Sequence, residues 1–122
     1  MGLESYQLGR QGEEIAAKYL TSLDYKIIER NFHSQQGEID IIAYDKETLV
    51  FAEVKNYSLR SYGSAFGAVR KSKRESIIHA ARTYLLRKNI RNVNCRFDVL
   101  AINTERSGKR SFILQKNAFL VN

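Results

Sequence analysis

The chain has 122 residues, enough for one domain that buries roughly two-thirds of its unfolded surface, so we expect a single domain over residues 1–122. Hydrophobic residues make up 43% and charged residues 27%, which excludes a disordered chain. The net charge of +7 favours a polyanionic partner such as nucleic acid, and a solvated basic surface is the alternative.

Export and membrane insertion find no support in the sequence. There is no run of eighteen apolar residues, and the N-terminal segment has no uninterrupted apolar stretch of the kind found in signal peptides. The single cysteine, Cys95, cannot form an internal disulfide, which favours a reducing compartment. We therefore expect a cytoplasmic protein without membrane contact.

The first predicted element is an amphipathic helix over residues 6–22, because its apolar residues recur at helical spacing. Glu13 shares a helical side with Ala16, Ala17 and Leu20, so it points nearer the core than Glu14 does. Glu13 is the better ligand candidate of the two. For both acids, simple stabilisation by the helix dipole is the alternative interpretation.

Residues Tyr25–Phe32 read as a strand, with Tyr25, Ile27 and also Ile28 expected to point inward. A polar turn over residues 33–37 leads to two further apolar runs, Ile39–Tyr44 and Leu49–Val54. The polar residues 45–48 between these runs predict a β-hairpin.

The register of this hairpin follows from its loop. If Tyr44 lies opposite Leu49, then Asp40 faces Glu53 and Glu38 faces Lys55. Side chains alternate along a strand, so these four residues share one face. The opposite face then carries the apolar residues Ile39, Ile41, Ala52 and Val54.

Two carboxylates directly across a strand pair repel each other and destabilise the pair. A divalent cation between Asp40 and Glu53 would offset that repulsion, since Mg²⁺ takes oxygen ligands from one or two carboxylates. The hairpin therefore predicts a metal site.

After Lys55 we expect a polar loop, beginning at Asn56, and then a helix from about Phe66 to Lys88. The segment from Lys55 to Arg96 contains eleven basic residues and one acid. Four basic residues at the start of the helix form the predicted nucleic-acid-binding set: Arg70, Lys71, Lys73 and Arg74. A solvated helix surface is the alternative.

Asn94–Asn103 alternates as a strand and follows a helix, so it is expected to pair parallel to Leu49–Lys55. A turn over residues 104–109 precedes a last strand, Arg110–Gln115. The predicted fold class is mixed α/β with the order α-β-β-β-α-β-β. Helices flank the mixed sheet, either one on each side or both on one.

Asp40 followed after twelve residues by Glu53-Val54-Lys55 resembles the D…(D/E)xK signature of restriction-endonuclease-like nucleases. The helix-borne Glu13 before the hairpin is similar to the arrangement in archaeal Holliday-junction resolvases. Over nearly the whole chain, the segments LGRQGEEIAAKYL, GEIDIIA, LVFAEVK and YGSAFGAVRKSKR resemble the YraN-like family of small, largely uncharacterised bacterial proteins.

The resemblance implies a restriction-endonuclease-like core and a site that uses Mg²⁺ or Mn²⁺. Asp40, Glu53 and the Val54 carbonyl would hold the metal, and Glu13 would complete its shell directly or through water. Lys55 would orient water and offset developing charge, while Glu38 would pair with Lys55 outside the shell.

The expected function is that of a metal-dependent endonuclease that hydrolyses phosphodiester bonds, with DNA expected as the substrate in preference to RNA. The resemblance implies branched or structured DNA. The resemblance to resolvases also implies a homodimer. Two alternatives stay open: a nucleic-acid-binding module without turnover, and an interaction subunit whose basic helix binds an acidic protein. The facing acids Asp40 and Glu53 favour the enzyme, because a module that only binds has no use for them.

Overall fold

A computed structural model describes residues 2–58 and 71–119, with side chains over 12–57 and 71–119. The elements follow the order α-β-β-β-α-β-β that the sequence predicts. In chain order they are α1 (Gly2–Ser22), β1 (Tyr25–His33), β2 (Glu38–Asp45), β3 (Thr48–Ser58), α2 (Lys71–Arg87), β4 (Cys95–Thr104) and β5 (Arg110–Gln115).

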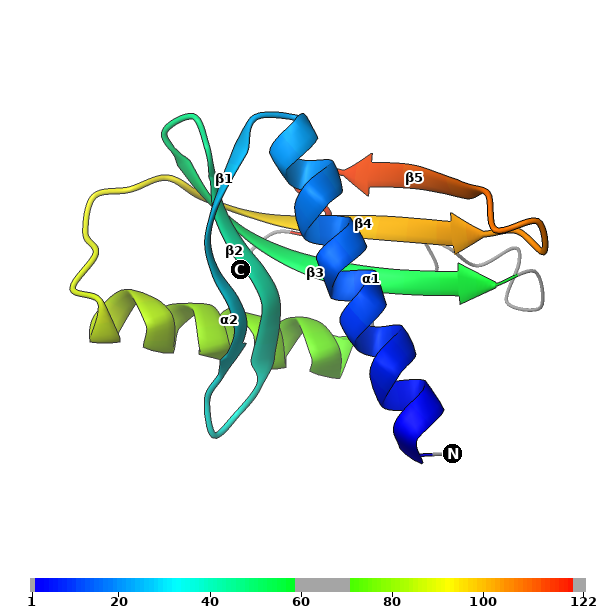
Figure 1. Cartoon of the computed structure of the whole chain (residues 1–122). Helices are drawn as coiled ribbons and strands as arrows, with labels where there is room; N and C mark the ends of the chain where they lie inside the picture. Colours follow the sequence, from blue (N-terminus) through cyan, green and yellow to red (C-terminus); the bar gives the residue numbers. More distant parts are fainter. Residues whose placement is uncertain (1, 59–70, 120–122) are drawn as a thin grey trace.

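The five strands form one mixed sheet in the order β1-β2-β3-β4-β5. Only β3 and β4 run parallel, as expected for strands joined through a helix, and the other neighbours are antiparallel. Figure 1 shows α1 across the front of the sheet and α2 behind it. Of the two predicted arrangements, the structure therefore has one helix on each side.

Each helix covers its own hydrophobic core. The α1-side core consists of Ala16, Ala17, Leu20, Tyr25, Ile41, Ala43, Val50, Ala52, Leu100 and Ile102. The α2-side core consists of Phe32, Ile39, Ile42, Leu49, Phe51, Ile77, Ala80, Ala81, Tyr84, Phe97 and Phe119. Because β2, β3 and β4 contribute to both cores, they are buried on both faces, as their near-continuous apolar runs predict.

Two predicted boundaries change by more than one residue, and the predicted start of the second helix at about Phe66 lies outside the described residues. Helix α1 begins at Gly2, four residues before its predicted start at residue 6. Strand β3 continues to Ser58, where we expected a loop from Asn56, because its parallel ladder with β4 extends to the Ser58–Thr104 pair. Within the described ranges, neither helix is long and apolar enough to cross a membrane.

Strand β1 contains a bulge, and the predicted inward orientation of Ile28 is wrong. The register with β2 shifts between Ile27 and Glu29, and Ile28 is 37% exposed rather than inward. A bulge leaves one residue of the strand without a direct partner, which is why a strict alternation fails here.

The prediction that Ile39 and Ile41 share one face of the hairpin is also wrong. Ile39 packs in the α2-side core and Ile41 in the α1-side core. On β1, Asn31 lies between the residues that pair with them and has a φ of 56°. This left-handed residue interrupts the regular pleat. Figure 1 shows β1 and β2 turned steeply against β3, β4 and β5.

Gly37, at the turn from β1 into β2, lies against the backbone of α2. A Cβ atom placed on Gly37 would lie 2.4 Å from the Ser76 carbonyl oxygen and 2.8 Å from the Ser76 carbonyl carbon. Backbone atoms cannot give way as a flexible side chain can, so only glycine fits here. This contact fixes α2 against the hairpin that carries the predicted metal ligands.

Candidate functional site

The β2–β3 hairpin has the register that the sequence predicts. Its pairing includes Tyr44 with Leu49 and continues regularly to Ile41 with Ala52. Asp40 and Glu53 are the next residues on the two strands. Beyond Ile41 and Ala52 the strands diverge, as the steep turn of β2 against β3 in Figure 1 shows.

The Asp40 side chain bonds to the backbone of β3 where the regular pairing of the two strands ends. Its Oδ2 atom accepts a hydrogen bond of 2.8 Å from the backbone N–H of Val54. A hydrogen bond from a backbone amide holds a carboxylate in one orientation and favours its charged form. Asp40 is therefore fixed beside β3.

Both carboxyl groups hold their protons more tightly than usual. Burial is the largest cause of the raised pKa of Asp40, opposed by the Val54 N–H and by Lys73. Burial, followed by the charge of Asp40, raises the pKa of Glu53 to about 7. The two acids therefore interact, as expected for residues predicted to face each other. Each protonation step belongs to the pair and not to one residue alone.

Glu13 approaches from α1 and is held by a residue that the sequence analysis did not select. Its Oε2 atom accepts a hydrogen bond of 2.7 Å from Asn31 Nδ2 on β1. The charge of Glu13 contributes to the raised pKa of Asp40, so Glu13 lies on the Asp40 side of the site. Asparagine is rare inside strands, and this is the signal that could have identified Asn31.

Glu38 and Lys55 do not form the pair expected of them. Glu38 Oε2 lies 3.1 Å from Nδ1 of His33, its cross-strand partner on β1. Lys55 is half-buried on β3, and it forms no ion pair with any acid in the described part of the chain. Because β1 also borders β2, His33 lies beside Glu38 and takes the place that was expected for Lys55.

Helix α2 places the predicted basic set in different surroundings. Lys71 is exposed, whereas Lys73 and Arg74 are half-buried, and Arg70 lies outside the described residues. Lys73 Nζ lies 3.6 Å from Glu53 Oε1. Arg74 Nε is buried without a hydrogen-bond partner among the described residues. Lys73 is therefore part of the carboxylate site, a role that the sequence analysis did not assign to it.

The donor set suits a hard cation with a sparse protein shell. Asp40 and Glu53 supply carboxylate oxygens, which Mg²⁺ and Mn²⁺ prefer. Across residues 12–57 and 71–119, no group of three or more His, Cys, Asp or Glu side chains is arranged to hold a metal ion. A cation that keeps several waters fits two carboxylates, and Mg²⁺ commonly does so.

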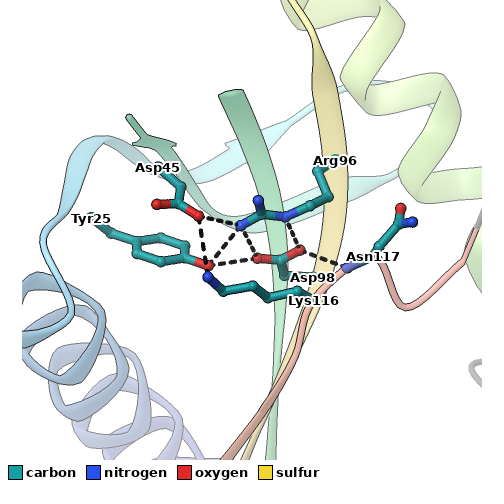
Figure 2. Close-up of polar contacts among 6 residues, drawn as sticks. All are labelled: Tyr25, Asp45, Arg96, Asp98, Lys116 and Asn117. Atoms are coloured by element: carbon teal, nitrogen blue, oxygen red, sulfur yellow. Dashed lines mark hydrogen bonds and ion pairs between the residues drawn. The ribbon is translucent and has the colours of Figure 1, made fainter. Parts of the chain in front are cut away.

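A second polar cluster, which the sequence analysis missed, lies at the other end of the hairpin. Figure 2 shows Arg96 between the carboxylates of Asp45 and Asp98, at 2.8 Å from each. Tyr25 donates its hydroxyl hydrogen to Asp98 at 2.9 Å, and the backbone N–H of Asn117 donates to Asp98 at 3.0 Å.

This second cluster balances its own charges. The two acids Asp45 and Asp98 meet two bases, Arg96 and Lys116, and Arg96 lowers the pKa of Asp45. Its groups join the ends of β1 and β2 to β4 and the segment after β5, so its role is structural. An arginine and an aspartate two residues apart on one strand face were the available signal.

At the Asp40–Glu53 pair, by contrast, Lys73 is the only described cation in an ion pair with either carboxylate. When both acids are ionised, two acids and one base leave a net negative charge on this site. The two clusters therefore differ in kind: one is complete within the described chain, and the other is suited to receive a further positive charge.

Comparison with known proteins matches residues 12–102 to the model of "Uncharacterised protein family UPF0102". A UPF0102 protein of Chlorobium limicola is 47% identical over 102 residues, covering 84% of this chain and 79% of the relative. A UPF0102 protein of Geobacter sulfurreducens is 50% identical over 95 residues, covering 78% and 74%. One from Alcanivorax borkumensis is 43% identical over 112 residues, covering 91% and 90%. The chain therefore belongs to the uncharacterised protein family UPF0102, the family that its motifs indicated as YraN-like.

Proposed function

We propose that this protein is a metal-dependent endonuclease that hydrolyses phosphodiester bonds in DNA, with branched or structured DNA as its substrate in the cytoplasm. The observation that carries the proposal is the Asp40–Glu53 pair. Two half-buried carboxylates with raised pKa values face one cation, Lys73, among the described residues. Such a site gains free energy by binding a divalent cation.

The chain's own residues have distinct tasks in this proposal. Asp40, the Glu53 carboxylate and the Val54 carbonyl would hold Mg²⁺ or Mn²⁺, and Glu13 would complete the shell directly or through water. A bound divalent cation polarises the phosphodiester and makes water a stronger nucleophile. Lys55 lies two residues from Glu53 on the same side of β3, where its ammonium group offsets charge that develops on the phosphate.

A nucleic acid substrate is supported by the charge of α2, which carries five basic residues and one acid between Lys71 and Arg87. Lysine and arginine bind phosphates and release the counterions condensed on DNA. The basic start of this helix lies beside the carboxylates through Lys73. A homodimer, which would bring two sites to a four-way junction, remains part of the proposal.

A second candidate is a nucleic-acid-binding module without turnover, and the Lys73–Glu53 contact favours it. A protein that never binds metal would have to neutralise its buried acids internally, as Lys73 does in part for Glu53. The two candidates differ in their response to a divalent cation. If the protein is the endonuclease, Mg²⁺ is expected to raise its melting temperature and Asp40→Asn to abolish that shift. If it is the binding module, Mg²⁺ is expected to leave the melting temperature unchanged.

The decisive test is cleavage of a panel of linear, flap, single-stranded and four-way DNA, and of RNA, with Mg²⁺ or Mn²⁺. Asp40→Ala and Glu53→Ala are each expected to reduce the rate at least about a hundredfold, because each removes a proposed ligand. Glu47→Ala, an exposed acid in the turn of the same hairpin, retains full activity. Full cleavage by both site variants would eliminate the proposal.

A further inference from the structure

Lys73 reaches the candidate site from α2, whereas the two acids come from the hairpin. Its Nζ atom lies 3.6 Å from Glu53 Oε1. The Glu53 side chain is 12% exposed and that of Lys73 is 41% exposed, so the ammonium group covers a buried carboxylate from the solvent side.

The two acids are stabilised by different kinds of contact. Asp40 is held by the backbone N–H of Val54 at 2.8 Å, a contact that does not need to move when a ligand arrives. Glu53 relies on a mobile partner, because lysine carries its charge on a flexible four-carbon stem. The contact that can be exchanged is therefore the one between Lys73 and Glu53.

A divalent cation on the Glu53 carboxylate would meet the Lys73 ammonium group at short range. Like charges at about 4 Å repel strongly where solvent screening is incomplete. When both acids are ionised, a single lysine charge leaves one of the two negative charges unmatched, whereas a divalent cation matches both. The two occupants therefore compete for one carboxylate, and the cation offers the fuller compensation.

We propose that Lys73 is the internal counter-ion of the metal-free site and that a divalent cation displaces it from Glu53. The inference rests on the proposed function, since it assumes that Asp40 and Glu53 hold a metal. It assigns the site two states: one with Lys73 on Glu53, and one with the metal on both acids and the Lys73 ammonium group released.

The test is a calorimetric titration of Mn²⁺ into the full-length protein stripped of metal. Lys73→Met removes the charge and keeps a long unbranched side chain, and we expect it to bind Mn²⁺ about tenfold more tightly than the parent protein. Arg82→Met is the matched control. It removes one charge from the same helix at an exposed position about two and a half turns away, on the opposite side. We expect its affinity to stay within about twofold.

Equal or weaker Mn²⁺ binding by Lys73→Met than by the parent protein overturns the inference and leaves the proposed metal function standing. Binding by neither the parent nor Lys73→Met overturns both. A gain of affinity in Arg82→Met as large as in Lys73→Met also overturns the inference, because the effect would then come from net charge alone.

A double-mutant cycle in chelator tests the metal-free state without using metal at all. Lys73→Met is expected to lower the melting temperature of the parent protein, and to lower it much less in a Glu53→Gln background, where the ion pair with Glu53 is gone and only the attraction of Lys73 to Asp40 remains. Equal losses in both backgrounds would show that Lys73 does not act through Glu53, and the inference would fall.

Discussion

Glu53 holds its proton more tightly than an ordinary carboxyl group, and this makes stability depend on pH. Its folded-state pKa of about 7 lies above the ordinary value of 4.5, owing first to burial and then to Asp40. The folded protein therefore binds the Glu53 proton more tightly than the unfolded chain does. Stability is highest below pH 4.5 as far as this group is concerned, and it falls as pH rises toward 7.

Replacing Glu53 by glutamine should remove this loss. At pH 8, in chelator, Glu53→Gln is expected to be more stable than the parent protein by about 2 kcal/mol, because an ionised, half-buried acid is replaced by a neutral group of the same shape. Urea unfolding at pH 5 and pH 8 measures the change. Glu47→Gln, in the exposed turn, should change neither value, and an unaltered pH slope in Glu53→Gln would contradict the assignment.

At the scale of elements, the site depends on how closely the hairpin lies against α2. Gly37 begins the hairpin, and Ser76 lies one helical turn after Lys73, so the Gly37–Ser76 contact fixes the height at which Lys73 meets Glu53. The same hairpin is held at its far end by Asp45, through Arg96. Strands and helix thus position the carboxylates from both ends.

Gly37→Ala should destabilise the protein by about 2 kcal/mol, since its Cβ would overlap the Ser76 carbonyl group and force the helix away. Denaturant unfolding measures the loss. Gly108→Ala is the comparison: its φ is 91°, yet no atom lies within 4 Å of the added Cβ. It should cost only the strain of a left-handed alanine, about 1 kcal/mol. A Gly37→Ala loss no larger than that of Gly108→Ala would contradict the close packing.

At the scale of the whole molecule, the excess of positive charge governs the proposed partner. The net charge is +7, and α2 presents its basic residues on the side of the sheet opposite α1. Binding to DNA should therefore weaken as salt rises, because each neutralised phosphate releases counterions.

Lys71→Ala should lower the slope of log affinity against log salt by about one unit on a short duplex, since one phosphate contact is lost. Fluorescence anisotropy between low and moderate salt measures the slope. Lys18→Ala removes from α1, on the other side of the sheet, a charge that is also exposed, and should leave the slope unchanged. Equal slopes for Lys71→Ala and the parent protein would remove α2 from the proposed interface.

Local pattern alone determined the order of elements, the hairpin register and the parallel pairing of β3 with β4. These features depend on alternation along a strand, on turn length and on the need for a crossover helix, all of which are legible within short stretches. The proximity of the Asp40 and Glu53 carboxyl groups followed from that register. The family resemblance then suggested their chemistry.

Tertiary structure decided the features that join distant segments. Asn31 holds Glu13, His33 takes Glu38 from Lys55, and Lys73 covers Glu53. Each partner lies on a neighbouring strand or on a helix across the sheet, and no sequence period specifies which of several charged residues will arrive there. The buried cluster around Arg96 and Asp98 has the same origin, because its six residues meet only when four segments have assembled. The sequence could place the acids on facing strands, but only the packing of α1 and α2 against the sheet brought Glu13 and Lys73 to them.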